Sequence, residues 1–83
     1  MVISPKIYNE KSGLLIACPI ASKVKGYPFA VELPPKLGGG WVLADQVKSL
    51  DWKIRQAKFK AKAPKKVMEE VLGKLGVLIF GEE

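Results

Sequence analysis

Apolar residues fall along this chain in short runs that predict strands, followed by one longer run with helical spacing. Leu14–Ile20 is a continuous apolar run of strand length, a pattern typical of a central strand buried on both faces. Pro19 has no amide hydrogen to donate, so strand pairing should loosen near the end of this run. Tyr27–Leu33 alternates between apolar and other positions as a half-buried strand does, and Pro34–Pro35 should end it.

The segments around these strands are predicted from their turn-forming residues. Val2–Ser4 is expected to be the end of a strand, and Tyr8–Gly13 a polar turn. Gly38–Gly40 should connect two strands as a hairpin, because glycine permits the positive φ angles of tight turns. Adjacent glycines can also offer amides to a phosphate, but this tract lacks the remaining residues of a P-loop. Trp41–Val47 is then expected as a strand, and Ser49–Trp52 as a tight turn.

The last third of the chain contains one more predicted strand and a helix. Residues 57–62 alternate alanine or phenylalanine with lysine, which indicates a strand whose lysine face meets either phosphates or only solvent. Pro64 suits the first position of a helix, and Glu70 and Lys74 have the spacing of a favourable ion pair. Glycines within the helix favour either close packing or fraying beyond Leu75. The apolar stripe of this helix consists of Val67, Met68, Val71, Leu72, Leu75, Leu78 and Ile79.

These elements predict a mainly β fold with a C-terminal helix that covers the sheet. With 83 residues, we expect a single domain over residues 1–83. A domain of this size buries only about 60–65% of the surface that its unfolded chain exposes, so its stability as a monomer should be marginal.

The charge of the chain favours polyanionic partners. The formal net charge is +6, with eleven basic and four acidic residues up to Lys62 and three basic and four acidic residues from Ala63 onward. Such a field suits nucleic-acid phosphates or an acidic peptide, although lysine-rich surfaces also serve solubility alone. Neither a signal peptide nor an apolar run long enough to cross a membrane is visible, so we expect a cytoplasmic protein.

Candidate metal ligands are scarce in this sequence. The chain has no histidine, and its one cysteine, Cys18, lies in an apolar run where a buried thiol is the usual occupant. Zinc sites draw on several cysteine and histidine ligands, so we expect neither a transition metal nor another cofactor. The sequence does not exclude a magnesium ion bound by carboxylates.

Two motifs in fixed order resemble the MazF/PemK group of mRNA-cleaving ribonuclease toxins. They are Lys25–Phe29 and Val42–Trp52, and the opening Ser4–Asn9 resembles the segment after the second strand of that family. The resemblance implies an SH3-like small barrel of the PemK/MazF type that lacks its first hairpin. Bared strand edges are rarely tolerated, so dimerisation should complete the barrel. Members of the family are homodimers inhibited by an antitoxin with an acidic tail, which implies the same partners here.

The resemblance also indicates a damaged nuclease centre. Cleavage of RNA without a metal needs a group that moves the proton of the 2′-OH and a group that stabilises the developing charge. The family relies on an arginine in an Arg–Pro pair before the resembling region and on a threonine whose position falls on Ala21. Arg55 cannot be equated with that arginine. We therefore expect impaired catalysis; the alternatives are an active ribonuclease that uses Ser22 and lysines, or a structural remnant without a role.

Binding can survive the loss of catalysis, because the residues that contact RNA need not be those that cleave it. Lysines would neutralise phosphates, a tyrosine ring offers a surface for an unstacked base, and a glutamine can read a base edge. The same aromatic and polar residues can instead pack strands or stabilise the barrel. The residues expected to face RNA or an antitoxin are Ser22, Lys23, Lys25, Tyr27, Asp45, Gln46 and Lys48.

Overall fold

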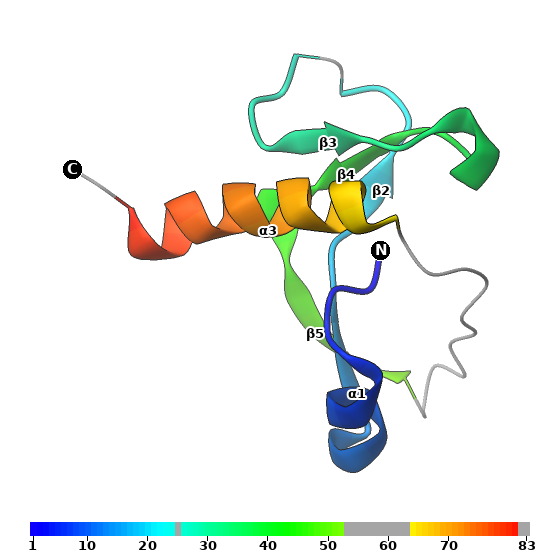
Figure 1. Cartoon of the computed structure of the whole chain (residues 1–83), viewed down its shortest axis with the longest axis vertical. Helices are drawn as coiled ribbons and strands as arrows, with labels where there is room; N and C mark the ends of the chain where they lie inside the picture. The colour runs from blue at the N-terminus through cyan, green and yellow to red at the C-terminus, as the bar shows by residue number, and fades with distance from the viewer. Residues whose placement is uncertain (25, 53–63, 82–83) are drawn as a thin grey trace.

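The structure, a computed structural model, describes residues 1–24, 26–52 and 64–81. Two small antiparallel sheets are followed by a long helix that crosses in front of one of them (Figure 1). One sheet has the order β1–β5 and the other the order β2–β4–β3. The elements are α1 (Lys6–Ser12), β1 (Leu14–Ala17), β2 (Ile20–Ala21), β3 (Ala30–Glu32), the 3₁₀-helix η1 (Pro35–Leu37), β4 (Trp41–Leu43), the 3₁₀-helix η2 (Ala44–Gln46), β5 (Lys48–Asp51) and α3 (Lys65–Phe80).

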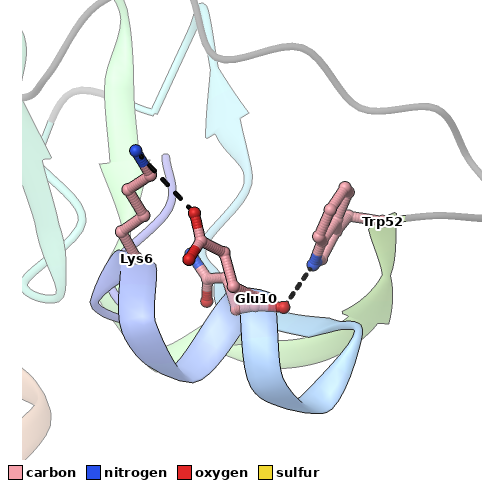
Figure 2. A network of polar contacts seen from close by, with 4 residues as sticks. Lys6, Glu10 and Trp52 are labelled. Carbon is pink, nitrogen blue, oxygen red and sulfur yellow. Dashed lines mark hydrogen bonds and ion pairs between the residues drawn. The ribbon is translucent and has the colours of Figure 1, made fainter.

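The polar segment after Pro5 forms helix α1, so the prediction of a turn over Tyr8–Gly13 was wrong. Asn9 explains the helix, because its side chain is buried and bonded to Ser4, whose hydroxyl donates to Asn9 Oδ1 at 2.5 Å. The backbone carbonyl of Asn9 also accepts a 2.8 Å hydrogen bond from Trp52 Nε1 (Figure 2). Gly13 ends the helix at a φ of 75°, a conformation that glycine adopts without strain. Tertiary contacts thus stabilise a helix that has no apolar stripe.

The apolar run Leu14–Ile20 divides into two strands that belong to different sheets. β1 pairs with β5, from Leu14 opposite Asp51 to Ala17 opposite Lys48, and β2 pairs with β4. The chain leaves one sheet for the other at Cys18–Pro19, which confirms that pairing loosens at this proline. Burial on both faces was wrong for much of the run: Leu15 and Cys18 are buried, whereas Ile20 is 51% exposed. The prediction of Ser49–Trp52 as a turn was also wrong, because most of it lies in β5.

Strands β3 and β4 form the hairpin that the three glycines predicted. Ala30, Val31 and Glu32 lie opposite Leu43, Val42 and Trp41, and Gly38–Gly40 all have positive φ angles. The hairpin strands are shorter than expected. β4 ends at Leu43, and Ala44–Gln46 turn into η2 instead of continuing the strand.

The first half of α3 packs on one face of the β2–β4–β3 sheet. Val67 and Val71 of the helix join Val31 and Val42 of the sheet in one buried cluster, which also contains Cys18, Leu33 and Ala44. The predicted burial of Cys18 is therefore confirmed. Residues directly opposite on neighbouring strands share a face, so the row of Val31 and Val42 forms the inner face of this sheet.

The second half of α3 extends beyond the sheets (Figure 1). The helix continues to Phe80, so the expected fraying beyond Leu75 was wrong, and nothing lies near enough to Gly73 to indicate close packing there. Glu70 and Lys74 were expected to pair, but Lys74 Nζ instead donates to the Pro28 carbonyl at 2.7 Å. The outer turns of the helix leave large apolar side chains exposed, namely Leu72, Val77, Leu78, Ile79 and Phe80.

The predicted fold class is confirmed: the protein is mainly β with a C-terminal helix, and its sheets are open in the manner of a partial barrel. The strand at residues 57–62 and its lysine face lie outside the described residues. Within the described ranges, no helix is long and apolar enough to span a bilayer.

Candidate functional site

The two motifs singled out in the sequence meet at a hydrogen bond between Tyr27 and Asp45. The Tyr27 hydroxyl donates to Asp45 Oδ2 across 18 positions of sequence. The backbone of the tyrosine is held by a turn, in which Tyr27 N donates to the Val24 carbonyl at 3.0 Å. Its ring lies edge-on to Phe29, with the ring centroids 6.1 Å apart. Tyr27 is thus anchored to η2 through its hydroxyl and the Asp45 carboxylate.

Two further features lie beside this contact: the buried second oxygen of Asp45, and a hollow that Tyr27 and Gln46 border. Asp45 Oδ1 is buried and accepts no hydrogen bond from the residues that the structure describes. The neighbouring Gln46 is exposed and lines a hollow of about 460 Å³ together with Val24, Tyr27 and Leu43. We name it the tyrosine hollow. Its lining combines the apolar side chains of Val24 and Leu43 with an amide and a phenol. Such a lining suits a planar polar ligand.

The hydrogen bond to Asp45 raises the pKa of Tyr27, with smaller contributions from burial and from the charge of Asp45. The bond requires the protonated phenol, so its stabilising contribution is present below the ordinary tyrosine pKa of about 10 and is lost as the pH rises through the raised value. We expect the Tyr8→Phe variant, which leaves Tyr27 as its single tyrosine, to form tyrosinate with a midpoint above 10 in an absorbance titration. Asp45→Asn in the same background should lower that midpoint; an unchanged midpoint would contradict the assigned contact.

A second hollow lies on the outer face of the β2–β4–β3 sheet. Ser22, Lys23, Glu32 and Trp41 line this hollow of about 760 Å³, which we name the tryptophan hollow. Ala21 and Glu32 lie opposite Trp41 on either side, so the three share the face opposite to that of Val42. Leu43, two residues along β4 from Trp41, faces the same way and reaches the tyrosine hollow. Trp41 and Leu43, which border the two hollows, are therefore about 7 Å apart along β4 by strand geometry.

The structure distributes the sequence-predicted binding residues over three places. Tyr27, Asp45 and Gln46 gather at the tyrosine hollow, and the exposed Ser22 and Lys23 border the tryptophan hollow. Lys48 lies in β5 opposite Ala17, in the other sheet. Lys25 and Arg55 lie outside the described residues.

The sequence analysis interpreted Trp41 as a residue that packs strands, and Glu32 as one of the residues that alternate with apolar ones in Tyr27–Leu33. It did not predict that Trp41 and Glu32 lie side by side. The signal was present in the hairpin, because the glycine connection places Glu32 directly opposite Trp41. Trp41 is only partly buried and Glu32 is exposed, so both side chains are accessible to a ligand. The bond from Lys74 to Pro28 had no local signal, since it joins residues 46 positions apart.

Two further properties limit the chemistry of this region. Within the part of the chain that the structure describes, no three residues of the types His, Cys, Asp and Glu gather as a set that would hold a metal ion. Burial raises the pKa of the Cys18 thiol, while the charge of the N-terminal amino group opposes that shift. A buried thiol with a raised pKa is a poor nucleophile at neutral pH. Polar groups of the sheet's outer face and its loops are left as the candidates.

Solved structures that match this fold include a MazF toxin and its complexes with MazE. A chain in a crystal structure of MazE–MazF from Deinococcus radiodurans superposes with a TM-score of 0.91 at 52% sequence identity, covering 99% of this chain and 84% of that one. A crystal structure of MazF from the same organism gives a TM-score of 0.89 at 53% identity, covering 96% of this chain and 74% of that one. The fold, with its open sheets and covering helix, is thus that of the MazF-type toxins.

Sequence comparison agrees with the structures. Residues 1–79 match the family described as PemK-like, MazF-like toxin of type II toxin-antitoxin system. The endoribonuclease toxin MazF of Escherichia coli strain K12 is 39% identical over 79 residues, which are 95% of this chain and 71% of that protein. The chain belongs to the PemK-like, MazF-like toxin family.

Proposed function

We propose that this chain binds single-stranded RNA on the outer face of its β2–β4–β3 sheet, and that its own ribonuclease activity is strongly impaired. The proposal rests on Ala21, the position at which the resemblance places the family's threonine. Ala21 pairs with Trp41 in the sheet and has no hydroxyl to offer a phosphate. Loss of one donor to a developing charge costs on the order of 10²–10³-fold in rate.

The neighbouring Ser22 does not take over this position without disrupting the sheet. Successive residues of a strand point to opposite faces, so a one-residue slip of β2 would reverse the direction of every side chain in it. The slip is opposed at Gly40, because a β-carbon built there already lies 3.1 Å from the Ala21 carbonyl oxygen and 3.0 Å from Ile20 Cγ2. The tight approach of β2 to Gly40 supports a fixed register, with Ser22 exposed beyond the strand.

The retained surface suits RNA in both charge and shape. The net charge of +6 attracts the phosphate backbone, and Lys23 and Ser22 border a hollow that contains an aromatic side chain. Proteins that bind single strands combine such basic grooves with aromatic rings on which bases stack. The residues proposed for contact are Ser22, Lys23, Lys25, Tyr27, Asp45 and Gln46, together with Lys48 of the other sheet, and Trp41 and Glu32 now join them.

The test compares binding with cleavage in the same samples. We expect the purified chain to bind a fluorescent RNA containing U and A at micromolar concentration in EDTA, and to leave it intact while the Escherichia coli MazF cleaves it. Lys23→Ala should weaken binding and should reduce the slope of log affinity against log salt concentration by about one, the effect of losing one phosphate contact. Rapid cleavage by the pure chain would contradict the proposed impairment. If Ser22→Ala abolished that cleavage, the alternative of a rebuilt active site would be correct.

A second candidate partner is an antitoxin with an acidic tail. The Deinococcus radiodurans structures of this fold include MazE–MazF complexes, and the positive charge of this chain suits an acidic peptide. An impaired toxin that still binds the antitoxin would sequester it. Titration with a matching acidic antitoxin peptide should show binding at micromolar concentration, and an absence of binding there would rule out this candidate.

The proposed working form is a homodimer that covers the outer end of α3. Val77 is 65%, Ile79 66% and Phe80 85% exposed, and these residues point in different directions around the helix. A helix that is apolar all round is normally buried, so its exposure in the single chain indicates a surface for a second copy. Sedimentation should give the mass of two chains at micromolar concentration.

A further inference from the structure

Trp41, Glu32 and Lys23 form a candidate base-binding subsite whose components lie in a fixed order across the sheet. β4 is the central strand of β2–β4–β3, so Trp41 lies between the loop after β2, with Lys23, and β3, with Glu32. All three residues line the tryptophan hollow. A base lying on the Trp41 ring would therefore have a cation on one side and a carboxylate on the other.

The Glu32 carboxylate is available to a ligand. It is exposed, and it takes part in neither of the ion pairs found among the described residues, which join Lys6 to Glu10 and Lys65 to Glu69. Its backbone is held in register opposite Trp41, so the carboxylate projects from a strand rather than from a loop. A carboxylate offers two acceptor oxygens and no donor.

Base chemistry selects one partner for such a group. The Watson–Crick edge of guanine presents two adjacent donors, N1–H and N2–H, which match the two oxygens of a carboxylate. Adenine and cytosine each present one donor beside an acceptor nitrogen, and uracil presents its N3–H between two carbonyl oxygens, so each would place an acceptor against Glu32. Bases of single-stranded RNA are read along this edge while they stack on aromatic side chains.

We propose that the tryptophan hollow is a guanine subsite, in which Trp41 stacks the base, Glu32 accepts hydrogen bonds from N1–H and N2–H, and Lys23 neutralises the adjoining phosphate. This inference rests on the proposed binding of single-stranded RNA. It adds a base preference, which the basic charge of the chain does not supply. The tyrosine hollow, one strand repeat further along β4, is placed to receive a neighbouring nucleotide of an extended strand.

The experiment measures anisotropy of short labelled RNAs that carry one variable base in a uridine background, in EDTA and at fixed salt. We expect the guanine RNA to bind about ten-fold more tightly than the adenine, cytosine and uridine RNAs. Inosine lacks the N2 amine and should lose most of this advantage on the unmodified protein. Trp41→Val should weaken binding of every RNA by about ten-fold through the loss of stacking.

Two glutamate variants separate base reading from general electrostatics. Glu32→Gln should remove the guanine advantage and leave the uridine RNA unaffected, whereas Glu10→Gln, with the same change of charge on α1, should preserve the advantage. If Glu32→Gln strengthened binding of all RNAs equally, the carboxylate would only repel phosphates and the subsite would be wrong. Equal affinity for all four RNAs would overturn the subsite but leave RNA binding intact. Binding of no RNA, with an acidic peptide bound instead, would overturn both proposals.

Discussion

Val71→Asp is expected to abolish the cooperative fold. Val71 is 0% exposed and packs in the cluster that joins α3 to the inner face of the sheet. An unpaired carboxylate in such a place costs several kcal/mol, while a domain of this length has a total stability of about 4–12 kcal/mol. Far-UV circular dichroism should show loss of helix, and thermal unfolding should lose its sigmoidal transition.

Val77→Asp is the matched control, because it makes the same change on the same helix at a side chain that is 65% exposed. A carboxylate in the last turns of a helix costs about 1 kcal/mol or less, so the helical spectrum should persist. Sedimentation should instead show that this variant is a monomer at concentrations at which the unmodified chain is a dimer. Equal loss of structure in both variants would contradict the docking of α3, and an intact Val77→Asp dimer would contradict the proposed interface.

Gly40→Ala is expected to destabilise the protein far more than Gly39→Ala. Both glycines have positive φ angles, 86° at Gly40 and 66° at Gly39, so an alanine at either position carries backbone strain of about 1 kcal/mol. Only at Gly40 does the new methyl group make tight contacts, at 3.0 Å from Ile20 Cγ2 and 3.1 Å from the Ala21 carbonyl oxygen. The shift of β2 that relieves these contacts should add about 1 kcal/mol or more.

Urea unfolding of the two variants, side by side, measures this difference. Gly40→Ala should also weaken RNA binding, since displacement of β2 would shift Ser22 and Lys23 relative to Trp41. Equal urea midpoints for the two variants would show that β2 moves aside at little cost in free energy. The argument for a fixed register at Ala21 would then fail.

The sequence predicted the elements whose signals are local. The three- and four-residue spacing of apolar residues after Pro64 identified α3, and the glycine tract identified the β3–β4 hairpin. Both depend on residues that are near each other in the chain, and a single pattern therefore suffices to find them. Fraying beyond Leu75, one of the two alternatives that the helix glycines left open, does not occur, because a glycine costs a helix only about 1 kcal/mol and is a weak signal.

Elements that depend on distant residues escaped prediction. α1 exists because Asn9 is fixed by Ser4 and by Trp52, the latter 43 positions away. β5 forms by pairing with β1, and the polar residues Lys48 and Ser49 gave it no strand pattern. Local propensity has little weight where tertiary contacts decide the conformation.

The candidate site also combines features that local signals predict with features that depend on distant residues. Tyr27 and Asp45 were recognised by resemblance, but their hydrogen bond required the folded chain. The subsite at Trp41 depends on strand register, which places a carboxylate and an indole side by side from residues nine positions apart. A sequence lists such residues without their orientation, and orientation decides whether they pack or bind.

The bond from Lys74 Nζ to the Pro28 carbonyl makes α3 a support of the loop that carries Tyr27. Asp45 of η2 holds Tyr27 of the same loop through a hydrogen bond. The conformation of this loop therefore depends on both α3 and η2. By thermodynamic reciprocity, a molecule that binds the ordered loop also tightens the attachment of α3, and a contact that fixes α3 raises affinity at the loop by the same factor. The proposed RNA binding on the outer face and the proposed assembly through the helix would thereby be coupled across the thickness of the protein.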